Sequence, residues 1–371
     1  MDFDFSPEQN ALRDAVRDTL AREAPSDYVR RMLDDERGFT DEMWREVADL
    51  GWTGLLVPEE HGGLGLGLVD MVVVLEEMGR LPLPGPFLSS AVLATLAARR
   101  LGDDDLLADL ASGVRRGTVA IEEVGTSGDP LAALATRATS NGDGWTLDGL
   151  KPVVLDGHTA DWVIVAARAE DGLGAFLVEA PSASAVPGMD PSRKIARLEL
   201  VSTPARRLGT GDATGAWRRV LDDAAVALCA ELVGACDQAF HIAAEYAKVR
   251  VQFGRPIGSF QAIKHMAADM VRDCTLARVG THYAAWASDT EAPDREVAAA
   301  MAKGWVGEAA VHVSGDSIQI HGGVGFTWAC DAHLYYKRAK VNDLLLGRQG
   351  WQRSRVADLL LGPAPSVTTS A

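Results

Sequence analysis

The chain has 371 residues, of which 47% are hydrophobic and 24% are charged, and its formal net charge is −16. These values are typical of a globular protein, and the length suggests two or three domains. The negative charge argues against a protein that binds nucleic acid through its phosphates, so an anionic ligand would need a local basic patch.

The N-terminus and the cysteines do not indicate export. Residues 1–5 are acidic and do not form a signal peptide pattern, and no apolar run approaches the roughly 20 residues that span a bilayer. The four cysteines show no C-x-x-C pairing, and we expect them to be structural thiols. The sequence therefore predicts a soluble, cytoplasmic protein with no metal site and no membrane partner.

Residues 1–115 are predicted to form an N-terminal helical domain. Ser6-Pro7-Glu8-Gln9 is a capping-box pattern with proline at the first helical position, and Thr40 begins another helix that Gly51 ends. The glycine-rich run at residues 57–67 interrupts the helical pattern, which resumes from Val69 to Met78.

Residues 116–220 are predicted to form a small β domain, either a barrel or a sandwich. Short β-rich runs such as Trp162-Val163-Ile164-Val165 and Ala175-Phe176-Leu177-Val178 are separated by turn signals such as Asn141-Gly142-Asp143-Gly144. This domain lies between two helical parts of the chain.

Residues 221–362 are predicted to form a C-terminal four-helix bundle. Apolar residues in 260–277 alternate spacings of three and four, and a second long helix is expected from Pro293-Asp294 towards Gln319. Helices before Arg250 and after Asp331 complete the bundle. Residues 363–371 are expected to be a loose tail, and the fold class is α+β, mostly α.

This domain order and several motifs resemble the acyl-CoA dehydrogenase superfamily over nearly the whole chain. In the N-terminal part the motifs are Val57-Pro58-Glu59-Glu60-His61-Gly62-Gly63-Leu64-Gly65 and Leu75-Glu76-Glu77-Met78-Gly79-Arg80. In the C-terminal part they are residues 250–261, between the first two bundle helices, and residues 318–326, after the third.

The resemblance implies FAD as the cofactor. In this family the two C-terminal loops reach across a dimer interface to hold the pyrophosphate and adenine end of FAD. The implied contacts here are Arg250, Gln252, Phe253, Ile257, Phe260, Gln261, Gln319, Gly322 and Gly323. An arginine can make two hydrogen bonds to one phosphate, and glycines let backbone amides approach an anion.

The family reaction is the α,β-dehydrogenation of an acyl-CoA thioester. A glutamate removes the α-proton, and the β-hydrogen leaves as hydride to flavin N5. The resemblance further implies an electron-transfer flavoprotein or a similar acceptor as a partner, and a homo- or hetero-tetramer.

Both family positions for the base lack a carboxylate. One position, after the last bundle helix, is occupied by Leu346, and the other, early in the first bundle helix, by Ala224 beside Asp222 and Asp223. Glu231 is the only acid in the apolar run from Ala224 to Cys236, and it lies about two helical turns beyond Ala224. It is a candidate base if unpaired, with a raised pKa, or a structural residue if it is paired.

The flavin-ring side also departs from the family. The T-E-P-x-x-G-S-D segment corresponds to residues 122–129, where Glu122 replaces the threonine, while Glu123 and Asp129 retain the acids. In the G-x-K-x-W-I-T-N-G segment, Val153 replaces the tryptophan that covers the flavin and Leu155 replaces the threonine that bonds near N5.

Four hypotheses follow. The favoured one is one half of a hetero-oligomeric acyl-CoA dehydrogenase, which resembles bacterial enzymes for steroid-derived acyl-CoAs and takes the base and ring pocket from a paralogous partner. The others are a homotetramer with a relocated base such as Glu231, a flavin monooxygenase or oxidase on the same fold, and a structural protein without flavin.

Overall fold

The N-terminal part is helical, as expected. The computed structural model describes residues 5–124, 128–132, 134–142 and 144–362. The first helices are α1 (Pro7–Glu23), α2 (Ser26–Asp34), α3 (Asp41–Asp49), α4 (Leu68–Gly79), α5 (Thr95–Leu101) and α6 (Asp105–Ser112). Two 3-10 turns (Trp52–Gly54 and Glu59–His61) and a π-helix (Phe87–Ala94) connect them.

The helix ends follow the predicted capping signals. The Ser6 hydroxyl oxygen accepts a hydrogen bond from the Gln9 backbone N–H, and Gln9 Oε1 accepts one from the Ser6 backbone N–H, so the capping box is formed. Thr40 caps α3 through the Met43 N–H, and Gly51 follows that helix with a φ of +77°. These predictions are confirmed.

The middle domain is a barrel-like sheet. Its strands are β1 (Gly117–Ala120), β2 (Arg137–Ser140), β3 (Trp145–Leu155), β4 (Trp162–Ala169), β5 (Gly172–Glu179), β6 (Ala183–Val186) and β7 (Ile195–Leu208). The strand order is β1-β4-β2-β3-β7-β5, and β5 also pairs with β4, which closes the ring. The interior is filled by small and aromatic apolar side chains such as Val163, Val165 and Phe176.

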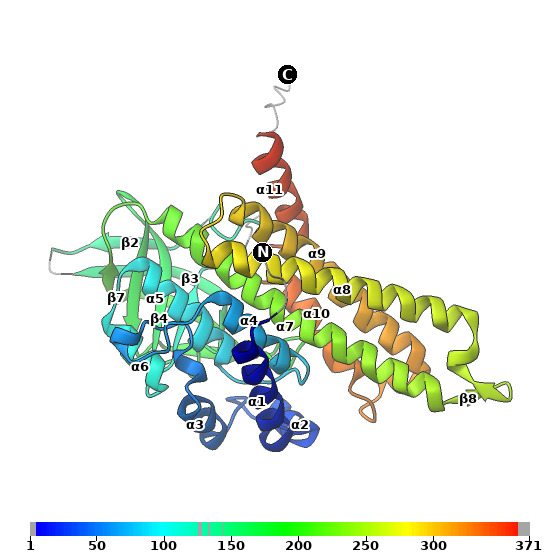
Figure 1. Ribbon diagram of the computed structural model, residues 1–371. Coiled ribbons are helices and arrows are strands. Elements are labelled where there is room, and N and C mark those ends of the chain that lie inside the picture. Colours follow the sequence, from blue (N-terminus) through cyan, green and yellow to red (C-terminus); the bar gives the residue numbers. More distant parts are fainter. Residues whose placement is uncertain (1–4, 125–127, 133, 143, 363–371) are drawn as a thin grey trace.

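The C-terminal part is the expected helical bundle. Its helices are α7 (Thr214–Val249), α8 (Gln261–Asp289), α9 (Arg295–His321), α10 (Ala332–Leu344) and α11 (Gln349–Leu361). A short hairpin of β8 (Val251–Gln252) and β9 (Arg255–Pro256) joins α7 to α8. In Figure 1 this hairpin lies at the end of the bundle far from the β domain, while α11 projects from the body.

The N-terminal domain and the bundle are joined where α4 crosses α7. A Cβ added to Gly79 would lie 1.9 Å from the backbone oxygen of Glu231, and one added to Gly234 would lie 1.8 Å from that of Glu76. The two backbones therefore touch directly, which only glycine permits at these positions. Glu231 is consequently placed in the interior between the two domains.

Helix α7 begins at Thr214, earlier than the predicted boundary after residue 220. The reason is packing, because Trp217 is fully buried and donates its indole N–H to the backbone oxygen of Gly174. Residues 214–220 are thus the first turns of the bundle helix. The predicted tail, residues 363–371, lies outside the described residues.

Candidate functional site

The two loops predicted to hold the adenine end of FAD lie together. Tyr246, in the last turn of α7, stacks on His321 at the end of α9, with ring centroids 4.6 Å apart. Arg250 and Gly322 follow these two residues, so both loops leave the bundle at the same end. The structure therefore brings the two motifs to one place.

Most of the predicted contact residues in these loops face outward. Arg250, Gln252, Gln261, Gln319, Gly322 and Gly323 are exposed, whereas Ile257 and Phe260 are partly buried. Phe253 is 93% exposed and has a φ of +52° in the hairpin turn. A Cβ at Gly322 or Gly323 would meet no atom within 4 Å, so the backbone here borders open space, and the Gly322 N–H itself donates to the Gln319 carbonyl. This surface fits an anionic group such as a pyrophosphate, held at an exposed edge.

The residues expected near a flavin ring line a different pocket. This pocket has a volume of about 1320 Å³ and lies between the β domain and the loop that joins α10 to α11. Its walls include Glu122, Val153 and Gly347. Leu155 is instead buried in the core, and its backbone oxygen accepts the Thr118 hydroxyl. We call this cavity the ring-side pocket. Its wall contains Glu122 and Val153 where the family has a threonine and a tryptophan.

Neither family position for the base carries a group that takes a proton. Ala224 has no exposed surface and packs in the main core cluster. Leu346 is also buried and has a φ of +58°, in the left-handed region that is uncommon for a residue with a side chain. Both positions are thus occupied by buried apolar side chains.

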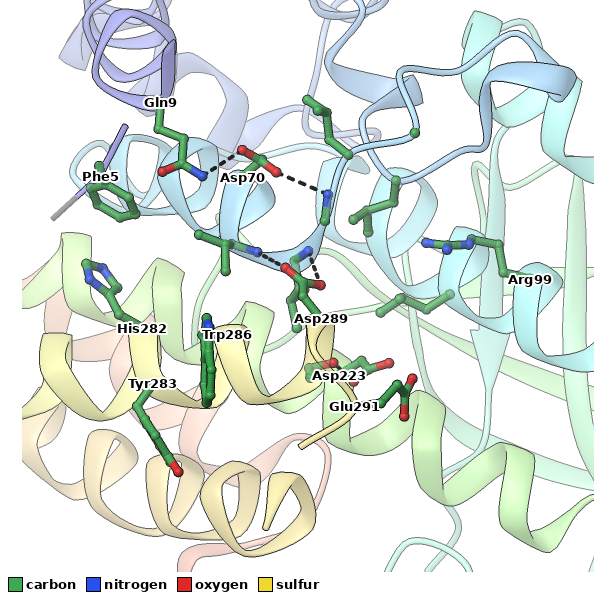
Figure 2. Close-up of a pocket in the computed structure, with 18 of the residues that line it drawn as sticks. Phe5, Gln9, Asp70, Arg99, Asp223, His282, Tyr283, Trp286, Asp289 and Glu291 are labelled. Carbon is green, nitrogen blue, oxygen red and sulfur yellow. Dashed lines mark hydrogen bonds between the residues drawn. The ribbon is translucent and has the colours of Figure 1, made fainter. Parts of the chain in front are cut away.

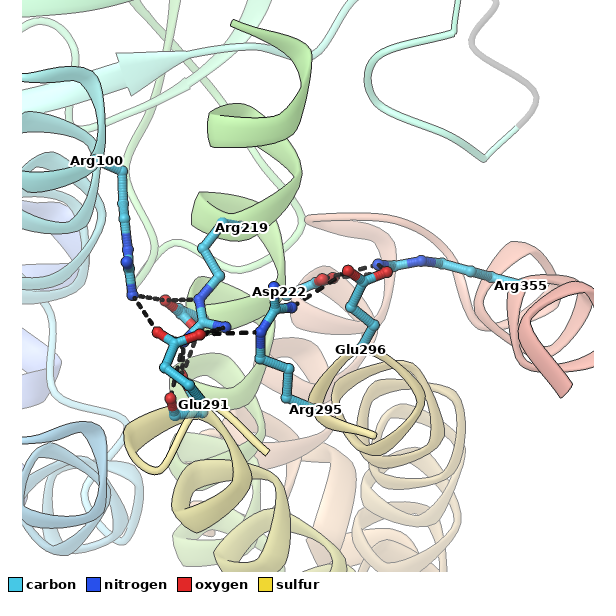
Figure 3. A network of polar contacts seen from close by, with 9 residues as sticks. Arg100, Arg219, Asp222, Glu291, Arg295, Glu296 and Arg355 are labelled. Atoms are coloured by element: carbon cyan, nitrogen blue, oxygen red, sulfur yellow. Dashed lines mark hydrogen bonds and ion pairs between the residues drawn. The ribbon is translucent and has the colours of Figure 1, made fainter. Parts of the chain in front are cut away.

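The acids beside Ala224 belong to an ionic network (Figure 3). Asp222 is paired with Arg355 of α11. Asp223 accepts the Arg219 Nε–H at 3.0 Å and the Ser288 hydroxyl at 2.5 Å. Arg219 also pairs with Glu291 at 3.0 Å. Both aspartates therefore hold helices together and are not free to act as a base.

Glu231 is paired, which is the structural alternative foreseen for it. Its carboxylate forms ion pairs with Arg193 and Arg338, both buried, and accepts a hydrogen bond from Asn342 at 3.4 Å. Burial alone would raise the pKa of Glu231, but the two arginines lower it below its ordinary value. Of the two alternatives left open by the sequence, the structure shows the paired one, and the sequence could not reveal the two distant arginines.

The acids retained in the flavin-side segment are structural as well. The Glu123 carboxylate accepts a hydrogen bond from the ammonium group of the fully buried Lys151 at 2.6 Å. Asp129 is held by both terminal nitrogens of Arg218, at 2.7 and 2.6 Å. The residues between them, 125–127, lie outside the described part of the chain. These pairs fix the segment to β3 and to α7.

In the sequence, Glu122 stands out only as a replacement for threonine. In the structure its Oε1 accepts the backbone N–H of Leu346 at 2.9 Å. Burial raises the pKa of the Glu122 carboxyl, and the Leu346 amide, Lys303 and Arg348 offset this effect only in part. The sequence signal is a carboxylate where the family has a threonine, but its partner is not legible, because residues 122 and 346 are far apart in the chain.

A second cleft, of about 720 Å³, lies between the start of α4 and the end of α8 (Figure 2). Asp289 caps α4 there by accepting the N–H groups of Leu68 and Val69 at 2.7 and 2.9 Å. Burial raises the pKa of Asp289, although these two bonds oppose the shift. The cleft contains none of the residues predicted for FAD.

Metal-binding clusters and membrane-spanning helices are both absent from the described residues. No three or more His, Cys, Asp or Glu side chains come together there as a metal site would require. Within the same residues, no helix combines the length and apolar character needed to cross a membrane.

Comparison with known proteins identifies the family. Residues 6–118 match the acyl-CoA dehydrogenase N-terminal domain, and residues 215–361 match the acyl-CoA dehydrogenase C-terminal domain. The acyl-CoA dehydrogenase IpdE2 of Mycolicibacterium smegmatis is 33% identical over 92% of this chain and 96% of its own length.

Two solved structures are similar over almost the full chain. A variant of the Tcur3481-Tcur3483 steroid ACAD has a TM-score of 0.88 and 35% identity, covering 95% of this chain and 97% of its own. The ChsE4-ChsE5 complex of Mycobacterium tuberculosis has a TM-score of 0.89 and 30% identity, covering 98% and 100%. The fold is that of an oxidoreductase. The chain belongs to the acyl-CoA dehydrogenase family.

Proposed function

We propose that this chain is one subunit of a hetero-oligomeric, FAD-dependent acyl-CoA dehydrogenase, assembled as a tetramer with a paralogous partner. The chain supplies the loops that contact the adenine and pyrophosphate end of FAD, and the partner supplies the base and the ring pocket. The substrate is an acyl-CoA thioester, and the electrons pass to an electron-transfer flavoprotein or a similar acceptor.

The separation of two sets of residues carries this proposal. Arg250, Phe253 and the Gly322-Gly323 pair are exposed at the far end of the bundle, where a neighbouring chain can approach them. The ring-side pocket lies beside the β domain, and position 346 next to it is a leucine. A division of labour between unlike chains accounts for the retention of the first set and the change of the second.

The chemistry of the reaction assigns the missing parts to the partner. When FAD is bound, it accepts the hydride that leaves the β-carbon of the thioester. The α-proton needs a carboxylate base close to the substrate, together with donors that stabilise the enolate oxygen. Leucine and alanine cannot accept a proton, so the proposal requires the partner's carboxylate.

Flavin stoichiometry tests the proposal. The chain is purified alone and after co-expression with candidate paralogues, and FAD is measured per chain by absorbance after denaturation. We expect little flavin in the lone chain, and flavin with acyl-CoA turnover in the complex. A lone chain that holds one FAD and oxidises acyl-CoA would refute the proposal.

A matched pair of variants tests the adenine-end loop. Arg250→Ala should lower the flavin content of the co-purified complex, because it removes a cation that can bind the pyrophosphate. The control is Lys248→Ala, two residues earlier, where the exposed ammonium is paired with Glu245 at 2.5 Å. Equal flavin loss in both variants would mean that Arg250 has no specific role.

A further inference from the structure

Glu122 lines the ring-side pocket and binds the backbone N–H of Leu346, the residue between Leu345 and Gly347 of the pocket wall. The Leu346 N–H donates to Glu122 Oε1 at 2.9 Å, and the Leu346 C=O accepts the Gln352 side-chain amide at 3.3 Å. Both backbone groups of this left-handed residue are therefore bound, and the loop is held in place. The amide is not available to a ligand in the pocket.

The carboxylate also sets the charge of the pocket wall. Its hydrogen-bond donor is a backbone amide, while the nearby cations Lys303 and Arg348 act on it only through their charge. Lys303 is fully buried and donates to the Asp343 backbone oxygen at 3.0 Å. When ionised, Glu122 presents an acceptor-only group to the pocket.

A flavin ring requires the opposite kind of wall. The pyrimidine edge of an isoalloxazine carries two carbonyl oxygens, which accept hydrogen bonds, and this edge gains negative charge on reduction. A threonine hydroxyl can donate to such an edge, whereas a carboxylate cannot donate and repels the developing charge. An enolate oxygen formed in the same pocket would meet the same repulsion.

We propose that Glu122 excludes an isoalloxazine ring from this chain's own pocket, by holding the Leu346 amide and by placing a carboxyl group in the pocket wall where the family has a threonine. The inference rests on the proposed function, in which this chain binds no flavin ring of its own. It gives a reason why the ring-side pocket, although about 1320 Å³ in volume, would not hold one. Catalysis in the hetero-oligomer is then confined to the pockets of the partner.

The experiment measures the binding of lumiflavin, an isoalloxazine without the adenine end, to the purified full-length chain by quenching of its fluorescence. Glu122→Thr restores the family residue, and Glu122→Gln removes the charge while retaining an acceptor for the Leu346 amide. Asp289→Asn is the control, because Asp289 is also a largely buried carboxylate that accepts backbone N–H groups, but in the other cleft. Thermal unfolding verifies that each variant is folded.

We expect Glu122→Thr to bind lumiflavin at least tenfold more tightly than the original chain. Glu122→Gln should gain less, because it still holds the Leu346 amide, and Asp289→Asn should bind no more tightly than the original chain. The inference is overturned if folded Glu122→Thr shows no gain, or if the control gains as much. These outcomes are independent of the FAD content of the co-purified complex. A complex with flavin and an unresponsive Glu122→Thr would refute the inference alone, whereas a lone original chain with one FAD would refute the proposed function as well.

Discussion

Arg355 binds Asp222 through both terminal nitrogens of its guanidinium, one of them at 2.8 Å, so the projecting helix α11 is fixed to α7 two residues before Ala224. Both side chains are nearly enclosed, with 12% and 7% exposure. The family position for a base in α7 is thus flanked by an acid that holds a helix in place.

The replacement Arg355→Met should destabilise the protein by about 3 kcal/mol, because it leaves Asp222 buried without its partner. Thermal or urea unfolding measures the change. Arg353→Met on the same helix is the control, since Arg353 and Glu308 form a more exposed pair, and its cost should be about 0–1 kcal/mol. Equal costs would show that the Asp222 pair does not anchor α11.

Glu231→Gln should destabilise the chain by about 3–5 kcal/mol at neutral pH, since Arg193 and Arg338 then lose a buried counter-charge. The native pKa of Glu231 lies below its ordinary value of 4.5, so the unfolded state binds the proton more tightly. The stabilisation by Glu231 is therefore present above about pH 4.5 and is lost as the pH falls through the native pKa.

Urea unfolding as a function of pH measures this effect as the difference between the original chain and Glu231→Gln. The difference should shrink in acid. Glu179→Gln is the control, because Glu179 is 56% exposed beside Arg115. A constant difference between pH 7 and pH 3 would contradict the paired state. Loss of turnover in a Glu231→Gln complex that keeps its fold and flavin would instead support Glu231 as the base.

Gly234→Ala should destabilise the protein by about 3 kcal/mol, because the new methyl group would overlap the Glu76 backbone oxygen and force α4 away from α7. Gly280→Ala is the matched control. Gly280 lies within α8, and a Cβ there meets no atom within 4 Å, so this change should stabilise the chain by about 1 kcal/mol. Chemical denaturation of both variants measures the contrast. A small effect at Gly234 would mean that the crossing is loosely packed.

Much of the fold could be predicted from local chemistry. The cap at Ser6, the cap at Thr40 and the helix that the structure places at Arg295–His321 all follow from residues close together in the sequence. The π-helix Phe87–Ala94 could not be predicted, because every residue in it is buried and the segment has no polar face. The start of α7 at Thr214 could not be predicted either, because its N-cap Ala213 offers no capping side chain as a signal and the packing of Trp217 depends on a distant strand.

The sequence indicates the motifs of the candidate site, but it does not show which of their side chains bind one another. The absence of a carboxylate at positions 224 and 346 can be read directly from the sequence. The partners of Glu231 are not, because Arg193 and Arg338 are separated from it by 38 and 107 residues. The bond between Glu122 and Leu346 spans 224 residues and depends on the packing of the β domain against the bundle.

The left-handed backbone at Leu346 has a consequence for the side chain that can stand there. A leucine at a φ of +58° meets the same steric cost as a glutamate would, and Gly347 beside it keeps a φ of +95°. Exchange between these two side chains therefore leaves the bend intact. A glutamate could therefore stand at position 346 without any remodelling of the loop, so the division of labour proposed above needs changes of side chain alone.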